Sequence, residues 1–464
     1  MNSDVKILRL GDMIFGRGGS FARRIIVFVF SVALKLFFRR IETVNSENTP
    51  RDEPVIFVMN HPNGLIDPAL VFVALPRKIS FLAKSTLFKM PVIGWLVRTV
   101  EALPIYRQSD AGEDVSKNKE TFTLARELLK RGGAIAIFPE GISHNETKLQ
   151  PLKTGAARIA IGAVSVGKNP SSLGLKIVPV GLFYTSKTMF RSEALLYFGE
   201  PFQVFPVELE NDEPPRKEAK ELTERIETAL REVTLNAESN TELETATQAE
   251  ELFSSVYEGI NFERSLADRF TFIKTYINEK IDVGYAPKKH DEKLEKRILN
   301  YERKLRELDI EPENLSLTDY SFWYVFRHFV VRVWVMLIFA PISIFGVILH
   351  LPAYQLGKFI ANRNKKHGAD DIVSTVKILA AMVFMPLTWI IFAVVLYFWW
   401  NWIAALVSIP VAIFSGYVAM RSLEEIEDLN GWFRAIKLFY LKRDKFLQLL
   451  VERRVLHEEL ESEK

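Results

Sequence analysis

The residues that most directly suggest chemistry are His61 and Asp67, in the segment Asn-His-Pro-Asn-Gly-Leu-Ile-Asp-Pro at positions 60–68. The apolar run 55–59 precedes them and is typical of a buried strand, so we expect His61 where that strand ends. A histidine whose second ring nitrogen is held by a carboxylate has a fixed tautomer and a stabilised imidazolium, as a general base requires. The base would act on a substrate hydroxyl. The alternative is that Asp67 is a helix N-cap followed by Pro68.

A second acidic segment, Phe138-Pro139-Glu140-Gly141, follows the apolar run 134–138. Gly141 permits close approach of another group to the backbone. Glu140 could accept a hydrogen bond from a polyol hydroxyl or hold a neighbouring cation, although a plain charged turn is the simpler alternative. His144 also lies nearby, and we expect it to shape the substrate loop.

Two cations end apolar runs in the same way. Lys84 closes the run 81–84, and Arg107 closes the run 102–107. In an open α/β sheet, ligands bind at the carboxyl ends of the strands. Lys84 and Arg107 beside the His/Asp pair would therefore suit a phosphate-bearing substrate, which Arg can bind in a bidentate manner. The alternative for each is ordinary surface charge.

The surrounding pattern predicts the elements that position these residues. Strand-like runs at 55–59, 134–138 and 175–182 alternate with helical stretches at 116–131 and 153–167. Such alternation predicts an α/β fold, with a mostly parallel sheet and flanking helices.

Changes in charge and hydropathy divide the chain into five predicted regions. The 15 or so apolar residues at 24–38 are too few for a span, which needs roughly 20, so we expect an interfacial helix. The regions are an N-terminal membrane-associated helical region (1–45), the α/β domain (46–205), a charged helical connector or subdomain (206–325), a hydrophobic membrane region (326–420) and an amphipathic soluble tail (421–464).

The membrane region contains apolar runs at 330–351, 376–397 and 403–420, and tryptophans flank the last two as in a headgroup belt. Three full spans would put the basic loop 358–366 on the face opposite the α/β domain, against the positive-inside preference. We therefore favour a re-entrant hairpin bent near Pro341. This predicts an integral membrane protein with every soluble part on the cytoplasmic face.

Composition excludes several classes of function. The chain has 464 residues and no cysteine, which excludes disulfides, thiolate metal sites and a cysteine nucleophile. Its net charge of +3 carries no nucleic-acid footprint. We also expect no cleavable signal peptide, because the first apolar run lacks a small-residue cleavage site.

Taken together, four segments resemble the motifs of the glycerolipid acyltransferase superfamily, over roughly residues 50–205. His61 and Asp67 match the first motif, residues 104–107 the second, residues 138–141 the third, and Val178-Pro179-Val180 the fourth. The resemblance implies that His61 is the base and Asp67 orients it. It also implies that the acceptor contacts Lys84, Arg107, Glu140, Gly141 and the turn that contains Pro179.

The family's donors are acyl-CoA or acyl-carrier protein, and neither a metal nor another cofactor takes part. Partners would thus be membrane lipids, an acyl thioester donor and a phosphorylated glycerol acceptor, with no nucleic acid. Five residues separate His61 from Asp67 where the usual first motif has four. This spacing is more similar to the membrane-bound glycerol-3-phosphate/dihydroxyacetone-phosphate acyltransferases. The implied reaction is O-acylation of glycerol-3-phosphate in phospholipid biosynthesis. The alternatives are a lysophosphatidic acid or other lysophospholipid acyltransferase, and a non-catalytic membrane scaffold.

Overall fold

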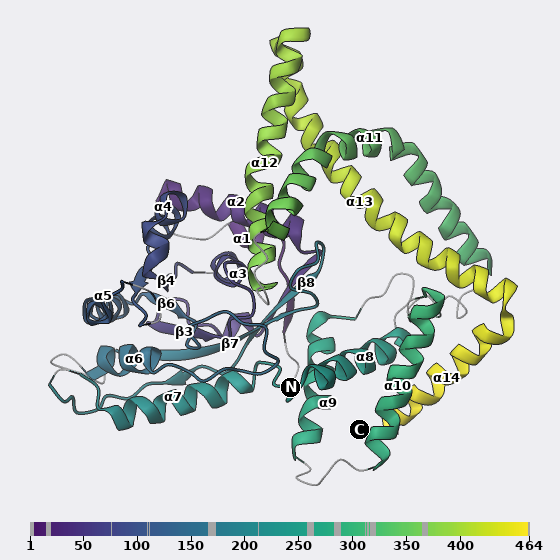
Figure 1. Cartoon of the computed structure of the whole chain (residues 1–464). Coiled ribbons are helices and arrows are strands. Elements are labelled where there is room, and N and C mark those ends of the chain that lie inside the picture. Colours follow the sequence, from purple (N-terminus) through teal and green to yellow (C-terminus); the bar gives the residue numbers. More distant parts are fainter. Residues whose placement is uncertain are drawn as a thin grey trace. The chain divides into compact units, whose positions relative to one another are not determined.

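The computed structural model describes residues 4–14, 20–75, 77–108, 110, 112–165, 173–211, 213–257, 264–282, 289–310, 312, 315, 322–363 and 370–462. The chain forms two compact units (Figure 1). The sheet unit comprises residues 1–236 and 365–378, and the helical unit comprises residues 237–364 and 379–464. The division falls after Asn236, so residues 206–236 of the predicted connector belong with the sheet.

The sheet unit is built on a nine-stranded sheet of order β1-β2-β8-β7-β3-β6-β4-β5, with β9 beside β7. The run β7-β3-β6-β4-β5 is parallel throughout, and β7 pairs antiparallel with β8. The predicted α/β fold with a mostly parallel sheet is therefore confirmed. The strands are β1 (Val5–Ile7), β2 (Arg40–Val44), β3 (Val55–Met59), β4 (Ser80–Lys84), β5 (Leu103–Ile105), β6 (Ala134–Ile137), β7 (Lys176–Tyr184), β8 (Glu193–Phe198) and β9 (Phe202–Gln203).

Helices cover both faces of the sheet, as a parallel sheet requires. One face packs on α5 (Asn118–Lys130), α6 (Gly155–Ser165) and α7 (Arg216–Arg231), which share one hydrophobic core with β3 and β6. The other face carries α1 (Leu10–Ile14), α2 (Phe21–Phe37) and α3 (Ile66–Ala74) (Figure 1). The short helix α4 (Pro91–Thr99) lies between β4 and β5 in the chain.

Helix α2 lies where the sequence predicts an interfacial helix, and it packs on the sheet unit. Arg23 is buried, and its guanidinium donates to the carbonyls of Ile79 (3.0 Å) and Val100 (2.8 Å). The same helix exposes large apolar side chains, among them Phe21 (78 % exposed), Ile25 and Phe28. At 17 residues, or about 26 Å, it is shorter than a bilayer span.

Four helices of the helical unit, joined by Leu438 from the end of a fifth, share a second hydrophobic core. They are α8 (Asn240–Tyr257), α9 (Leu266–Asp282), α10 (Lys289–Leu308) and α14 (Arg443–Ser462). The last contributes the buried side chains Phe446, Leu449 and Leu456 to this core. Residues from the predicted connector and from the predicted soluble tail thus form one bundle, because their apolar faces cover each other.

Three of the described helices are long and apolar enough to cross a membrane: α11 (Phe322–Arg363), α12 (Asp370–Trp399) and α13 (Trp402–Leu441). The expected hairpin at Pro341 is absent, because residues 322–363 form one continuous helix with Pro341 and Pro352 inside it. Proline is tolerated there because neighbouring helices satisfy the freed backbone groups, and the helix bends instead of ending. Figure 1 shows α11 as an arch.

The arch follows from the partners of α11 along its length. Its first half runs antiparallel to α13, where Arg332 lies 3.3 Å from Glu425. Further along, Nε2 of His350 accepts a hydrogen bond from Nε1 of Trp389 on α12, at 2.8 Å. Small residues allow the close approach: a Cβ on Gly346 would lie 2.1 Å from the carbonyl oxygen of Ser415 on α13.

Candidate active site

The predicted site residues gather at one edge of the sheet. The strands β3, β6, β4 and β5 are parallel neighbours, so their carboxyl ends share an edge. His61 follows β3, Glu140 follows β6, Lys84 ends β4 and Arg107 follows β5. The topology therefore brings the proposed base, the acidic turn and both cations to the same edge, in that order across the sheet.

His61 and Asp67 form the predicted pair. The distance from Nδ1 of His61 to Oδ2 of Asp67 is 2.8 Å, and the Asp67 carboxylate is fully buried. Helix α3 begins at Ile66, so Asp67 lies inside its first turn and is not the N-cap; the capping alternative is wrong. With Nδ1 donating to the carboxylate, Nε2 of His61 is the nitrogen left to accept a proton.

The segment between His61 and Asp67 is one residue longer than in the usual motif, but its fold still places Asp67 against the imidazole. The backbone N–H of Asn63 donates to Oδ2 of Asp67 at 2.7 Å, and Gly64 takes a φ of +34°, which favours glycine. Asn60 attaches the turn to β7, because its side chain donates to and accepts from the backbone of Leu182, at 3.0 and 2.7 Å. The five-residue separation is therefore compatible with a well-formed pair.

Asp67 has one further partner that the sequence did not predict. The hydroxyl of Tyr184, the last residue of β7, donates to Oδ1 of Asp67 at 2.6 Å. Burial, together with the adjacent Asp67 charge, raises the pKa of Tyr184 well above its usual value. The hydroxyl is therefore a permanent donor. The only signal in the sequence was its position at the carboxyl end of a strand.

Glu140 is buried, and its carboxylate is occupied by groups of the protein. Its Oε1 accepts from the backbone N–H of His61 at 2.9 Å. Its Oε2 accepts from the backbone N–H of Gln150 at 2.8 Å and pairs with Nε2 of His144. These contacts favour a role in holding the His61 backbone over the predicted direct contact with an acceptor.

The turn after β6 also supports the imidazole ring. Phe138 stacks on His61 with ring centroids 4.2 Å apart and an angle of 21° between the planes. Gly141 adopts a φ of +78°, and its N–H donates to the carbonyl of Phe138 at 3.0 Å. A side chain at position 141 would strain this turn, so Gly141 is needed for the backbone shape that places Phe138 and Glu140.

Lys84 and Arg107 differ in how they are partnered. Nζ of Lys84 lies 2.8 Å from Oδ1 of Asp110, and the lysine side chain is 36 % exposed. No residue in the described part of the chain hydrogen-bonds to the half-buried guanidinium of Arg107. Burial lowers the pKa of Arg107, and the nearby charge of Asp110 opposes that shift. Arg107 is thus the better placed of the two to bind an incoming anion.

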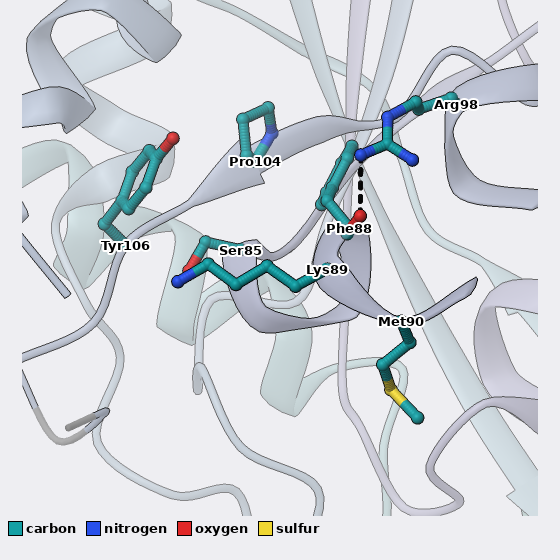
Figure 2. A pocket seen from close by; sticks show the side chains of 7 residues that line it. All are labelled: Ser85, Phe88, Lys89, Met90, Arg98, Pro104 and Tyr106. Carbon is teal, nitrogen blue, oxygen red and sulfur yellow. Dashed lines mark hydrogen bonds between the residues drawn. The ribbon is translucent and has the colours of Figure 1, made fainter. Parts of the chain in front are cut away.

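A hollow of about 510 Å³ is lined by sequence neighbours of both cations: Ser85, which follows Lys84, and Tyr106, which precedes Arg107. Its lining combines basic and apolar groups: Ser85, Phe88, Lys89, Met90, Arg98, Pro104 and Tyr106 (Figure 2). In Figure 2 the Arg98 guanidinium donates to the carbonyl of Phe88, at 2.6 Å. Lys89 in turn lies 2.5 Å from Glu113.

Pro179 lies where the fourth motif was expected, but in a different conformation. The expected turn at 178–181 is instead the interior of β7, with Pro179 in register with Val58 of β3. Its ring is buried, and its carbonyl accepts from the N–H of Gly199 at 2.8 Å. The segment contributes to the site by carrying Tyr184 to the edge of the sheet.

Within the described residues, no group of three or more His, Cys, Asp or Glu side chains is arranged to hold a metal ion. The donor set at the sheet edge consists of the imidazoles of His61 and His144, the carboxylates of Asp67 and Glu140, and basic groups. The chemistry that this arrangement supports is proton transfer at Nε2 of His61 next to cations.

Known proteins match both units. Residues 40–182 match the family model Acyltransferase, and residues 273–462 match the glycerol-3-phosphate acyltransferase 2 C-terminal domain. The chain is 28 % identical over 296 residues to glycerol-3-phosphate O-acyltransferase 2 of Saccharomyces cerevisiae, covering 60 % of this chain and 38 % of the relative. It is 25 % identical over 470 residues to glycerol-3-phosphate O-acyltransferase 1 of the same yeast, covering 79 % and 60 %.

The chain therefore spans 38 % and 60 % of the lengths of these two yeast relatives. A shorter relative is covered more fully. The chain is 30 % identical over 165 residues to a 1-acyl-sn-glycerol-3-phosphate acyltransferase of Bacillus subtilis, covering 35 % of this chain and 73 % of that protein. By these matches and by the site at the edge of its sheet, the chain belongs to the glycerolipid acyltransferase superfamily.

Proposed function

We propose that the protein is a membrane-bound O-acyltransferase that moves a fatty acyl group from an acyl thioester to a hydroxyl of glycerol-3-phosphate. The observation that carries this proposal is the 2.8 Å contact between His61 and the buried Asp67 at the ligand edge of a parallel sheet. The yeast relatives, named as glycerol-3-phosphate O-acyltransferases, support the choice of reaction.

The reaction needs only one proton acceptor from the protein. Nε2 of His61 removes the hydroxyl proton as the oxygen attacks the thioester carbonyl, and the Asp67 carboxylate stabilises the imidazolium that forms. A carbon–oxygen bond forms, the carbon–sulfur bond breaks, and the proton passes from His61 to the departing thiolate. The donor is acyl-CoA or acyl-carrier protein, and the proposed reaction uses neither a metal nor another cofactor.

The phosphate of the acceptor would bind at the β4–β5 side of the site. Neighbouring strands lie about 4.8 Å apart, so the ends of β4 and β5 lie about 10 and 14 Å from the end of β3. Long side chains of Lys84 and Arg107 reach part of that distance. Arg107, which has no hydrogen-bond partner among the described residues, gains most from a phosphate because it can bind two oxygens at once.

The helical unit favours glycerol-3-phosphate over a lysophospholipid as acceptor. The Bacillus subtilis relative, named as a 1-acyl-sn-glycerol-3-phosphate acyltransferase, matches only 165 residues. The second family model, named for a glycerol-3-phosphate acyltransferase, covers residues 273–462. Lysophosphatidic acid is therefore the second candidate acceptor, followed by other lysophospholipids.

We further propose that all soluble parts lie on the cytoplasmic face. Lys377, near the start of α12, donates to the carbonyl of Thr188 at 2.9 Å within the sheet unit, so α12 begins on the face that carries the site. Two crossings, by α12 and α13, return the chain to that face. Arg332, near the start of α11, pairs with Glu425, which lies beyond the apolar part of α13. The start of α11 is therefore also on the cytoplasmic face, and the arched helix enters and leaves the membrane on that face. The basic residues Lys358 and Arg363, near the end of α11, then satisfy the positive-inside preference, whereas residues 364–366 of the predicted basic loop lie outside the described residues.

The reaction is tested with purified protein in lipid nanodiscs and radiolabelled acyl-CoA, or acyl-carrier protein as a second donor. The acceptors are glycerol-3-phosphate, dihydroxyacetone phosphate and lysophosphatidic acid. We expect the fastest transfer to glycerol-3-phosphate, and transfer about a thousandfold slower to every acceptor with His61→Ala. Faster transfer to lysophosphatidic acid would favour the second candidate. A folded wild-type protein that transfers to no acceptor from either donor would indicate the non-catalytic scaffold.

A further inference from the structure

Three hydrogen-bond donors converge on the carboxylate of Asp67. Oδ2 accepts from His61 and from the backbone of Asn63, and Oδ1 accepts from the hydroxyl of Tyr184 at 2.6 Å. The Tyr184 contact joins residues 117 positions apart and is the only hydrogen bond that Oδ1 accepts within the described residues. Without it, this oxygen would be buried beside the base with its charge uncompensated.

Tyr184 is itself held in place. Its ring is almost fully buried and stacks on Phe38, with centroids 5.6 Å apart and an interplanar angle of 24°. Phe38 is fully buried and is the C-cap of α2, where its N–H donates to the carbonyl of Leu34. The phenol therefore has little rotational freedom, and its hydroxyl meets Oδ1 in one direction only.

We propose that Tyr184 is a positioning residue for acyl transfer, acting through Asp67 on His61. Its hydroxyl fixes the plane of the carboxylate, so that Oδ2 faces Nδ1 of His61 and Nε2 faces the hydroxyl to be deprotonated. It also shares the carboxylate charge, which limits how strongly Asp67 stabilises the imidazolium. The inference rests on the proposed function and adds to it a residue outside the four motifs.

The test is Tyr184→Phe, which removes the hydroxyl and keeps the ring, with acyl transfer to glycerol-3-phosphate measured against pH. We expect kcat to fall about tenfold, as for loss of a hydrogen bond to a buried charge, with both KM values within twofold of wild type. The acid limb of the kcat/KM profile should move to higher pH, because Asp67 then stabilises the imidazolium more strongly. Tyr197→Phe, on β8 of the same sheet, is the matched control and should leave kcat and the acid limb unchanged.

The readouts separate a positioning role from a structural one. A structural role would lower the melting temperature without moving the acid limb. A folded Tyr184→Phe protein with kcat within twofold of wild type, or with an unmoved acid limb, would overturn the inference. If that variant fails to fold, Phe38→Leu loosens the phenol while keeping its hydroxyl. The same shift of the acid limb is then expected, and its absence overturns the inference. Absence of acyl transfer by the wild type counts against the proposed function instead.

Discussion

The backbone N–H of His61 donates a 2.9 Å hydrogen bond to Oε1 of Glu140, a residue 79 positions later in the chain. The contact crosses from β3 to its parallel neighbour β6. The N–H of His144 also donates to the carbonyl of His61, at 3.3 Å, so the loop after β6 holds the backbone of the base on both sides. The turn that contains Glu140 thus fixes the position of the His61 imidazole.

Glu140→Gln should lower kcat and stability and leave the KM for the acceptor unchanged. The NH2 group of the glutamine would face one of the two backbone N–H groups from which Glu140 accepts, so that hydrogen bond is lost. Loss of a hydrogen bond to a buried charge lowers the free energy of unfolding by about 2 kcal/mol. Melting temperature and steady-state kinetics measure the two effects. Glu146→Gln, exposed on the same loop, is the control. A selective rise in acceptor KM would instead support direct contact between Glu140 and the acceptor.

His61→Ala should reduce kcat by about a thousandfold, because the general base is lost while the binding groups remain. The protein should still insert into membranes and keep its melting temperature, since His61 is partly exposed and its backbone contacts do not need the ring. His144→Ala removes the other imidazole of the site, which pairs with Glu140, and should cost far less. Equal losses in the two variants would mean that the base is wrongly assigned.

Arg107→Ala should raise the KM for glycerol-3-phosphate by about tenfold or more, with kcat and the donor KM little changed. The reason is that a bidentate contact with phosphate contributes to binding before the reaction begins. Arg131→Ala, an exposed arginine at the end of α5, serves as the control. The phosphate role fails if the acceptor KM stays at the wild-type value.

Gly346→Ala should disrupt the packing of α11 on α13. The added Cβ would lie 2.1 Å from a backbone oxygen of Ser415, which cannot move aside, so overpacking should cost about 1–3 kcal/mol. Gly357→Ala, on the same helix, places its Cβ at an ordinary 3.5 Å from Ala380 and should be neutral. Thermal unfolding in detergent compares the two. Equal stability of both variants would argue against close contact of these helices.

The topology can be tested without background labelling because the chain has no cysteine. A cysteine at Lys365 should react with an impermeant maleimide from the cytoplasmic side, and one at Asn401, between α12 and α13, from the opposite side. Right-side-out and inverted vesicles supply the two orientations. Labelling of Lys365→Cys and Asn401→Cys from the same side would exclude the proposed arrangement.

The sequence was sufficient to predict the local parts of the site. His61, Asp67 and the strand before them lie within 13 positions, from 55 to 67, and the alternation of apolar runs with helical stretches predicted the parallel sheet. Parallel strands place their carboxyl ends together, so the sequence alone was enough to assign Glu140, Lys84 and Arg107 to one edge.

Contacts between distant segments were beyond that reasoning. Tyr184 reaches Asp67 because β7 and β3 are adjacent, and no periodicity in the sequence indicates that register. Likewise, the sequence of α14 suggested a solvated amphipathic helix, because the helices that cover its apolar face lie some 150 residues earlier in the chain. The ion pair between Lys304 and Glu452, at 2.8 Å, joins the two segments. Pro341 suggested a chain reversal because a helix interior normally excludes proline, but the packed neighbours of α11 compensate for the missing hydrogen bond.

The buried Arg23 has a consequence for how the sheet unit would meet lipid. Its two hydrogen bonds, to Ile79 just before β4 and to Val100 at the C-cap of α4, attach α2 to the backbone of the sheet unit and restrict its tilting and sliding against the sheet. If the exposed face of Phe21, Ile25 and Phe28 entered the headgroup layer, as the sequence predicts for this helix, the height of His61 above the bilayer would be set at the same moment. Substitutions on that face should therefore alter which acyl donors, dissolved or partitioned into lipid, can reach His61.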